Sequence, residues 1–462
     1  MRFDKHFLQQ ALASSTILYD NFPSDATFSI DTRTLKKGDI FVALSGQLVD
    51  GHDFLQNALD KGAAGFFIDK KKQKIVDSLD QKTLSTKLVI FVEDTFKSFI
   101  KMATAWRNQF DCSVVAITGS VGKTSTKELV ANILKYNETS FVSSYGNQNT
   151  QLGLSLNMLK MKSNHKVALF ELGINKRGEM AKLANMLRPT IGLITNIGHS
   201  HMEGLGSLND IAIEKRDIFK YFTETNIGII NGDQKELTGV GYAHPVVKVG
   251  GKTVNQIQAR KITVKNDHID FVLKIYKKKY PITLQQTHTG IVYNLLGATA
   301  VAHLLGVSDD VIIKAIEKPL TIAGRFERCA IKDNQGLLIN DSYNANPESM
   351  KSALLAFEKI TTESKKIAVL GDMLELGVNS PFWHRQLGRF LRKVPTLKHV
   401  ILVGENISWT KKTVPVTVRA DCVKNWEDAV SLLESTLTGD DVILVKGSHG
   451  MKLGNLVKHF TV

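Results

Sequence analysis

A glycine-rich loop between a buried strand and a helix constrains the fold of this chain more than any other feature. Residues 114–124 read VVAITGSVGKT, an apolar strand followed by two glycines, a lysine and a threonine. Glycines let backbone N–H groups surround phosphate oxygens, Lys123 supplies an ammonium, and the Thr124 hydroxyl suits Mg²⁺. Apolar residues at helical spacing follow the loop, which predicts a helix directly after it. We predict a nucleoside triphosphate site made by Thr118, Gly119, Ser120, Val121, Gly122, Lys123 and Thr124.

The loop is a shortened form of the usual phosphate-loop pattern. Ile117 stands where G-x-x-x-x-G-K-[ST] has its first glycine. The alternative interpretation is a glycine turn that carries a surface lysine. The strand before the loop and the helix after it favour the phosphate site.

Length and composition indicate a soluble protein of several domains. The 462 residues exceed what one hydrophobic core supports, so we expect about three domains. No apolar run is long enough for a membrane span, and the first fifteen residues lack the apolar core of a secretory signal. We therefore expect a cytoplasmic protein without a membrane span. Cys112, Cys329 and Cys422 have no metal or redox spacing and are predicted to be reduced.

The formal net charge of +14 raises nucleic acid as a partner. The densest basic runs are DKKKQK at 69–74 and KIYKKK at 274–279, and both are short. They are typical of solvated faces or a hairpin turn. A protein that handles small polyphosphates explains the charge equally well, so we expect no nucleic-acid partner.

The order of strands and helices predicts an α/β fold with three domains. Residues 1–108 form a small N-terminal α/β domain, with two strands around a turn in FSIDTRTLKKGDIFVAL and a helix over 54–61. Residues 109–319 form a central, mostly parallel domain, with antiparallel strands between 246 and 282 and a helix over 294–305. Residues 320–462 form a Rossmann-like domain with strands in GLLIND, KKIAVLGD, HVILVG and DVILVKGS.

Several polar side chains follow predicted strands of the central domain. Glu171 ends the strand VALFE, where a doubly wound sheet binds its ligand, and is our candidate for a second Mg²⁺ ligand. A surface glutamate is the alternative. His199, His201 and Glu203 alternate, so an extended segment would direct all three to one side. They suggest a second metal, Mg²⁺ rather than zinc, or a clamp on phosphate, although His199 alone suits a structural role.

Two further segments differ in how strongly their residues point to a functional site. Lys215 lies between Glu214 and Arg216 in a helix whose inward face carries Ile211, Ile218 and Phe219, so composition predicts a solvated lysine. After the strand GLLI, by contrast, residues 340–347 (NDSYNANP) concentrate hydrogen-bonding groups. In this region Arg325 could bind a γ-phosphate or carboxylate bidentately, and Asp341 could face the metal.

Together these blocks resemble the ATP-dependent Mur ligases of peptidoglycan synthesis. The resemblance is carried by GSVGKT, ELG, TNIGHSHMEGLGS, IAIEK, AGR and NDSYNANPESM, and it spans essentially the whole chain. DSYNANP and GDMLELG resemble in particular those members that add D-alanyl-D-alanine to a UDP-MurNAc-tripeptide. The resemblance therefore implies these two partners, ATP, two Mg²⁺ ions and amide formation through an acyl phosphate.

The resemblance also implies roles for individual residues. Lys215 would be carbamylated and hold one Mg²⁺ together with His201, while Thr124 and Glu171 would hold the other. Asn294 and Tyr343 would contact the adenosine, and Arg325 and Asp341, with Lys123, would complete the catalytic site when the third domain closes. The substrate contacts would be Thr32, Arg33, Gly46, Asp50, Gly51, His52, Asn147, Asn149, Asn344, Asn346 and Ser448.

The chain departs from the family pattern at three positions. Thr150 replaces a usual asparagine, Gly290 a common histidine and His449 a common arginine. A sister ligase or a folylpolyglutamate synthase-like enzyme is the nearest alternative. A P-loop ATPase stimulated by nucleic acid is a remote one. A monomer is expected.

Overall fold

The computed structural model describes residues 2–265, 268–332 and 336–461. The chain divides into two compact units, which are described separately. The first comprises Met1–Val115, Thr139–Leu172 and Lys182–Pro189, and the second comprises Ala116–Glu138, Gly173–Ala181 and Thr190–Val462. Within the described residues no helix has the length and apolar character that crossing a membrane requires.

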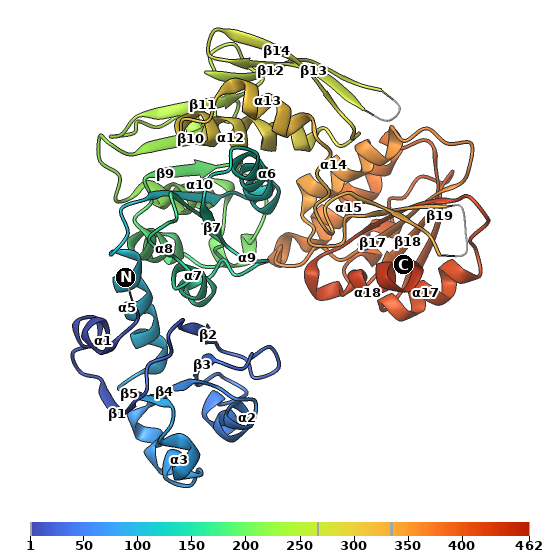
Figure 1. Cartoon of the computed structure of the whole chain (residues 1–462). Helices are drawn as coiled ribbons and strands as arrows, with labels where there is room; N and C mark the ends of the chain where they lie inside the picture. The colour runs from blue at the N-terminus through green and yellow to red at the C-terminus, as the bar shows by residue number, and fades with distance from the viewer. Residues whose placement is uncertain (1, 266–267, 333–335, 462) are drawn as a thin grey trace. The chain divides into compact units, whose positions relative to one another are not determined.

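The N-terminal part carries a five-stranded sheet in the order β1-β5-β4-β3-β2 (Figure 1). Only β1 is antiparallel to its neighbour. The strands are β1 Thr16–Asp20, β2 Thr27–Ser29, β3 Asp39–Val42, β4 Gly65–Asp69 and β5 Leu88–Val92. The helices are α1 Lys5–Ala11, η1 Gly51–Phe54, α2 Leu55–Asp60, η2 Lys70–Lys72, α3 Gln73–Asp77, α4 Gln81–Leu84 and α5 Thr95–Arg107. Buried aromatic and aliphatic residues of β3, β4, β5 and α2 form the core there.

The second sheet has nine strands in the order β14-β13-β12-β11-β10-β9-β6-β8-β7. Its strands are β6 Ser113–Thr118, β7 Phe141–Ser143, β8 Val167–Glu171, β9 Ile191–Ile194, β10 Ile227–Asn231, β11 Val246–Gly250, β12 Ile257–Val264, β13 Ile269–Ile275 and β14 Lys278–Leu284. The helices are α6 Lys123–Tyr136, α7 Gln151–Met158, α8 Glu179–Leu187, α9 Met202–Leu205, α10 Leu208–Arg216, η3 Asp217–Phe219, α11 Lys235–Thr238, α12 Gly290–Leu304 and α13 Asp309–Glu317. Strands β12, β13 and β14 form an antiparallel meander.

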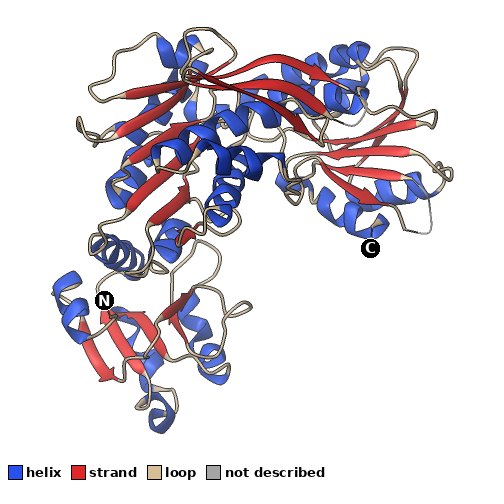
Figure 2. Ribbon diagram, turned by 45° about the horizontal axis from the view of Figure 1, so that its top comes forward, coloured by secondary structure: helices blue, strands red, loops and turns tan. Residues whose placement is uncertain are grey.

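The third sheet has the order β15-β16-β20-β17-β18-β19 and is parallel except for β15. Figure 2 draws its strands in red and the neighbouring helices in blue, in the part that holds the C-terminus. Its strands are β15 Glu327–Ala330, β16 Leu337–Asn340, β17 Lys366–Gly371, β18 Leu397–Val403, β19 Arg419–Val423 and β20 Val442–Lys446. The helices are α14 Pro347–Glu358, η4 Gly377–Asn379, α15 Ser380–Phe390, η5 Leu391–Lys393, α16 Ser408–Lys411, α17 Trp426–Glu434, η6 His449–Met451 and α18 Leu453–Phe460.

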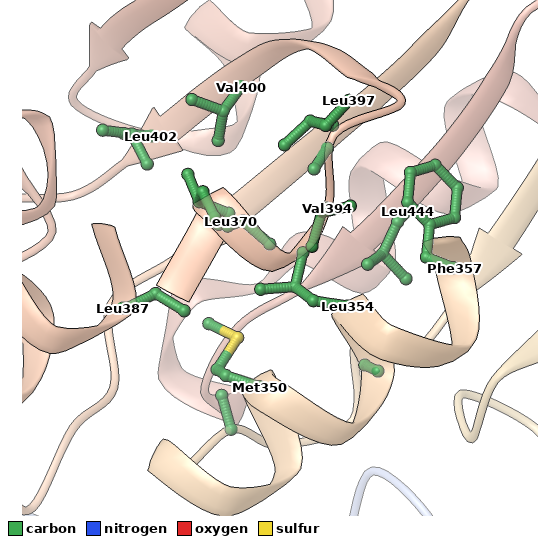
Figure 3. Close-up of a cluster of buried hydrophobic side chains, with 14 of the residues drawn as sticks. Met350, Leu354, Phe357, Leu370, Leu387, Val394, Leu397, Val400, Leu402 and Leu444 are labelled. Carbon is green, nitrogen blue, oxygen red and sulfur yellow. The ribbon is translucent and has the colours of Figure 1, made fainter. Parts of the chain in front are cut away.

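Both faces of the third sheet are apolar, as a parallel sheet covered by helices requires. Leu370 and Leu444 belong to one core cluster, with α14 and α15 (Figure 3). Val369 and Val445 belong to the other, with α17 and α18. Successive residues of a strand alternate between the faces. Each fully buried leucine contributes about 1.5–3 kcal/mol to folding.

The structure confirms the predicted α/β fold and most predicted elements. The four strands expected in the third domain are present, and residues 276–277 form the turn of the β13–β14 hairpin. The two strands expected in 27–42 are present and pair in parallel. Helix α12 begins at Gly290 rather than at 294, and β11, expected to be antiparallel, is parallel to its neighbours. β15 and β19 were missed, because their alternating half-exposed residues give no apolar run. The domain boundaries at 108 and 319 stay a prediction.

Candidate active site

The predicted phosphate loop connects β6 to α6, as its sequence indicates. Gly122 is the N-cap of α6 with a φ of 85°, and Gly119 has a φ of 150°. A Cβ at Gly122 would collide with the side-chain oxygen of Asn294, and one at Gly119 with the hydroxyl of Thr195. Glycine is therefore required at both positions for conformation and for space.

The loop is fixed to the segment that follows β9. Val121 donates its N–H to the Asn196 side chain (2.8 Å), and the Thr195 hydroxyl donates to the Val121 carbonyl (2.6 Å). Ser120 exchanges hydrogen bonds with the backbone of Gly198, each at 2.9 Å. The loop is thus organised before any phosphate binds, as electrostatic stabilisation of a transferring phosphoryl group requires.

Lys123 and Thr124 contact protein atoms that a phosphate ligand could replace. The Lys123 ammonium donates to the carbonyl of Gly119, within its own loop (2.8 Å). The Thr124 hydroxyl accepts a hydrogen bond from Nη2 of Arg325 (3.3 Å). Arg325 opens the third domain, so residues two hundred positions apart meet at the phosphate loop.

Arg325 lies in a setting that suits an anion. Its guanidinium carbon is 4.0 Å from the ring centroid of Tyr343, a cation–π contact. Its Nε is buried and has no hydrogen-bond partner among the described residues. A buried N–H without an acceptor is costly, so the site fits a ligand that supplies an oxygen.

A cavity of about 410 Å³ lies between the phosphate loop, α12 and the third-domain strand ends. Its walls include Gly122, Tyr293, Asn294, Arg325, Asp341 and Lys446. The predicted nucleotide residues Asn294 and Arg325 are therefore brought together with the loop. The cavity has the size and mixed polarity of a small-ligand site.

Lys446 and Asp341 form a buried ion pair in the cavity wall. Nζ of Lys446 is 2.7 Å from Oδ2 of Asp341, and their side chains are 2% and 11% exposed. Lys446 also donates to the carbonyl of Asn344 (2.9 Å), and Oδ1 of Asp341 accepts the Phe326 N–H (3.2 Å). Burial lowers the pKa of Lys446, and Asp341 opposes that shift. Both carboxylate oxygens of Asp341 are thus engaged within the protein.

His288 fills the space beside Gly290. A Cβ on Gly290 would lie 2.6 Å from the His288 ring, so the imidazole occupies the place of a side chain at 290. The ring packs on Phe326 at 5.0 Å between centroids, and Nε2 is 3.2 Å from the Ser352 hydroxyl. Burial lowers the pKa of His288, which favours the neutral imidazole.

Lys215 is buried, contrary to the solvated lysine that composition predicts. It is 1% exposed on α10, and no hydrogen bond or ion pair engages its ammonium in the described part of the chain. Glu214 beside it accepts instead from the N–H groups of Gly178 and Met180. Burial lowers the pKa of Lys215 well below its ordinary value, the charge of Lys123 adds to the shift and Glu214 opposes it. Lys215 shares the inward face of Ile211, four residues earlier.

His199, His201 and Glu203 do not line one side of an extended segment. His201 has a φ of 56° and α9 begins at Met202, which leaves Glu203 exposed. Nδ1 of His201 lies 2.5 Å from Oε2 of Glu375, and this contact lowers the pKa of Glu375. Both histidines instead contact the third domain.

His199 is held by two side chains of that domain. Its Nδ1 is 2.5 Å from Oε1 of Glu348, and its N–H donates to Oε2 of the same residue (3.2 Å). Its ring lies 4.4 Å from that of Trp383. These contacts fit the structural role that the sequence left open for His199.

In the first unit, Glu171 is a buried carboxylate and not a surface glutamate. It is 2% exposed at the end of β8 and accepts a hydrogen bond from the Asn149 amide (3.0 Å). Asn147 is exposed, and its carbonyl accepts the Asn149 N–H (2.7 Å). Thr150, which replaces the usual asparagine, caps α7 through Gly153 N–H. Ser/Thr and Asn both serve as helix caps, so the replacement keeps this function.

The predicted UDP-sugar residues lie in two segments of the N-terminal part, residues 32–33 and residues 46–52. His52 is fully buried: Nε2 accepts the Asp69 N–H (3.1 Å), and Nδ1 is 2.6 Å from Oδ1 of Asp50. Lys72 reaches the other oxygen of Asp50 (2.8 Å). Arg33 is exposed and bonded to Asp31, and Thr32 is buried with its carbonyl bonded to Lys61 (2.6 Å). Any Cβ on Gly46 or Gly51 would approach backbone atoms within 2.8 Å.

Three predicted substrate-binding residues of the third domain make hydrogen bonds within the protein. Asn346 caps α14 through Ser349 N–H (2.8 Å), and Asn344 bonds to the Ala345 N–H (2.9 Å). The Ser448 hydroxyl accepts the Leu374 N–H (2.9 Å) and lies 3.4 Å from the Ala345 carbonyl. Their proposed contacts with substrate stay predictions.

Sequence reasoning missed Glu348, Glu375, His288 and Lys446. A signal was present for Lys446, because it ends the buried strand VILVK at the edge where parallel sheets bind ligands. The partners of the histidines carry no such signal, since they depend on contacts between distant segments.

Comparisons with known proteins cover almost the whole chain. The Mur ligase middle domain matches residues 117–302, the "Mur ligase, glutamate ligase domain" residues 324–449, and the "Mur ligase family, catalytic domain" residues 27–94. The UDP-N-acetylmuramoyl-tripeptide–D-alanyl-D-alanine ligase of Rickettsia prowazekii is 31% identical over 93% of this chain and 94% of its own. That of Bacillus subtilis is 30% identical, covering 93% and 91%.

Solved structures agree with the sequence comparisons. MurF from Acinetobacter baumannii superposes with a TM-score of 0.83 at 25% identity, over 99% of this chain and 98% of that one. MurF from Thermotoga maritima in complex with ADP gives 0.79 at 26% identity, over 94% and 97%. Together with the phosphate loop and the cavity beside it, these matches establish that the chain belongs to the Mur ligase family.

Proposed function

We propose that this chain is an ATP-dependent ligase that joins D-alanyl-D-alanine to UDP-MurNAc-tripeptide and so forms a peptidoglycan precursor. The observation that carries the proposal is Arg325, which extends from the third domain to Thr124 of the phosphate loop with a buried, unpartnered Nε beside the cavity. The relatives at 31% and 30% identity are named for this reaction.

The proposed reaction forms an amide by way of an acyl phosphate. The terminal carboxylate of the tripeptide attacks the γ-phosphorus of ATP, and the bond to the bridging oxygen breaks to release ADP. The amine of the dipeptide then attacks the acyl carbon, phosphate leaves and the amine loses a proton. Lys123 and Arg325 would offset the negative charge that opposes the first attack.

Two Mg²⁺ ions would neutralise phosphate charge when bound, and the chain offers hydroxyl, carboxylate and imidazole side chains as ligands. We propose that Thr124 and the buried carboxylate of Glu171 hold one, and that His201 and a carbamylated Lys215 hold the other. Burial lowers the pKa of Lys215 and so favours its neutral amine, which is the form that attacks CO₂. The nitrogen bonds to the carbon of CO₂ and releases a proton, which converts Lys215 into an anionic oxygen ligand.

The adenosine contacts and the domain organisation belong to the same proposal. We propose adenosine contacts at Asn294 and Tyr343, and the domain boundaries 1–108, 109–319 and 320–462. We propose that the third domain, which carries Arg325 and Asp341, rotates toward the central domain when ATP binds. X-ray scattering curves that change with Mg²⁺ and ATP would support this rotation. We further propose a monomer located in the cytoplasm, where ATP is available.

Phosphate release tests the reaction. UDP-MurNAc-tripeptides are supplied with ATP and one amine at a time, with D-Ala-D-Ala compared with single D-alanine, glutamate and other amino acids. We expect release that depends on the dipeptide. Release with a single amino acid would identify a sister ligase or a folylpolyglutamate synthase-like enzyme. ATPase activity that rises with DNA or RNA and ignores the dipeptide would identify the remote alternative.

The carbamate has its own test. In ¹³C-labelled bicarbonate we expect a carbamate resonance in the wild-type protein and none in Lys215→Ala. A resonance that persists in the variant would reject Lys215 as the modified residue.

A further inference from the structure

The ion pair between Lys446 and Asp341 lies in the cavity wall, next to the segment that carries Arg325. Lys446 is 2% exposed at the C-terminal end of β20, on the face of the sheet that Leu444 shares. Burying an ammonium is costly unless a carboxylate and hydrogen-bond acceptors surround it. Asp341 and the Asn344 carbonyl provide both, so the ammonium has a fixed position.

A hydrogen bond connects the ion pair to the backbone next to Arg325. Asp341 uses its second oxygen to accept the N–H of Phe326, which directly follows Arg325. Phe326 has a φ of 54°, a left-handed conformation that a bulky residue adopts only where its surroundings impose it. The bond from Asp341 therefore helps to hold an unfavourable backbone conformation beside Arg325.

The other side of Arg325 is held to the same segment. The N–H of Tyr343 donates to the carbonyl of Gly324 (3.3 Å), and the Gly324 N–H donates to Glu327 (2.9 Å). Residues 324 and 326 are thus both bonded, so the backbone fixes the direction in which the Arg325 side chain leaves. The Tyr343 ring, 4.0 Å away, supports that direction.

The direction of Arg325 matters because its Nε has no acceptor within the described residues. A phosphate oxygen in the cavity would accept that N–H in a charge-assisted hydrogen bond, whose strength depends on geometry. A displacement of about 1 Å in a site that positions reacting groups costs about 10²-fold in rate. A group that sets the backbone of Arg325 therefore acts on phosphoryl transfer without touching it.

We propose that Lys446 is a positioning residue, which aims Arg325 at the terminal phosphates of ATP through Asp341 and the Phe326 backbone. The role rests on the proposed function, since it concerns the phosphates of that reaction. It also explains why both oxygens of Asp341 are engaged within the protein. Asp341 would complete the site through Arg325.

A double-mutant cycle tests the proposal. Lys446→Met keeps the length of the side chain and removes its charge, and it is combined with Arg325→Ala. Lys366→Met is the matched control, because Lys366 is also 2% exposed in the same sheet and, among the described residues, donates to the carbonyls of Phe357 and Glu358 and not to a carboxylate. Steady-state kcat and KM are measured for all variants, and the Kd for ATP by calorimetry.

We expect Lys446→Met to lower kcat by about 100-fold and to leave KM for the UDP-sugar peptide unchanged. In the Arg325→Ala background the same substitution should lower kcat no further, because residues that act as a unit are not additive. Lys366→Met should keep the wild-type kcat. An equal loss in both backgrounds, or a Lys446→Met enzyme as active as Lys366→Met, would overturn the proposal.

A second variant and a second measurement keep the test decisive. Should Lys446→Met fail to fold, Lys446→Gln replaces it in the cycle, since it also removes the charge of the pair but keeps a polar group in the buried site. A wild-type chain that ligates no dipeptide would reject the proposed function alone. In that case the cycle uses the Kd for ATP. If Lys446→Met raises this Kd in the wild-type background but not in Arg325→Ala, the role of Lys446 is supported. If it raises the Kd equally in both backgrounds, the proposal is overturned.

Discussion

The regions around Lys215 and Lys446 bury a lysine almost equally but differ in what surrounds it. Lys215 on α10 has no carboxylate within ion-pair distance in the described residues, because Glu214 caps α8 instead. Lys446 on β20 is 2.7 Å from Asp341. Burial lowers both pKa values, and the charge of Asp341 opposes that shift at Lys446. Burial alone favours a neutral, reactive amine, whereas burial with a carboxylate produces a fixed cation.

The largest expected effect on stability separates these two regions. Lys446→Met leaves the buried carboxylate of Asp341 without its partner, so the free energy of unfolding should fall by about 3–5 kcal/mol. Lys215→Met removes a buried amine that has no partner, so stability should stay equal or rise. Denaturant unfolding of both variants measures the difference. Equal losses in the two variants would show that the environments are energetically alike.

The next test concerns the chemistry of Lys215. Lys215→Ala should lower phosphate release by about 10²–10³-fold, the usual cost of removing one group that stabilises transferring charge. A short carboxylic acid should restore part of it by replacing the carbamate oxygens. The exposed Lys220, beyond the end of the same helix, provides the control Lys220→Ala, which should match the wild type. Unaltered turnover in Lys215→Ala would remove the carbamate from the mechanism.

Lys366 provides an intermediate case. It is buried and donates to two backbone carbonyls at 3.0 and 2.9 Å, without a carboxylate. Lys366→Met leaves those carbonyls unsatisfied, which should cost about 1–3 kcal/mol of unfolding free energy. Denaturant unfolding should place this variant between Lys215→Met and Lys446→Met. A loss as large as that of Lys446→Met would mean that the carboxylate is not what distinguishes Lys446.

The smallest effect is expected where a similar pair is exposed. The Lys72 side chain is 38% exposed and lies 2.8 Å from Asp50. Burial raises the pKa of Asp50, but the hydrogen bonds from Lys72 and His52 outweigh it and hold that pKa below its usual range. Lys72→Met should change the melting temperature by about 2 °C or less.

The pH dependence of this pair follows from the sign of the Asp50 shift. A carboxylate with a lowered pKa stabilises the folded state above its unfolded value of about 3.9 and loses that contribution as pH falls toward the folded value. The difference between wild type and Lys72→Met should therefore shrink below about pH 4. A difference that stays constant as the solution is acidified would contradict the pairing.

Much of the fold and of the phosphate site followed from local sequence. The loop at 119–124 could be predicted because its glycines, lysine and threonine act through their own backbone and follow a continuous apolar strand. The strands of the third sheet followed from their apolar runs. β15 and β19 are half-exposed edge strands, and their residues carry no comparable pattern.

The rest of the site depends on contacts that sequence spacing does not reveal. The charged neighbours of Lys215 led to the prediction of a surface residue. Its spacing of four residues from Ile211, which is buried, indicates instead that it lies on the buried face of the helix. His201 and Glu375, which contact each other, both have left-handed backbones, and no glycine marks either position in the sequence. Asp341 was predicted as a site residue, but its bond to Lys446 joins segments a hundred residues apart.

The interlock of His288 with Gly290 has an evolutionary consequence. Because the imidazole occupies the volume that a Cβ at 290 would need, neither position is free to vary alone. A larger side chain at 290 would fit here only alongside a smaller residue at 288. A substitution that enlarges position 290 should therefore be tolerated only together with one that shortens position 288.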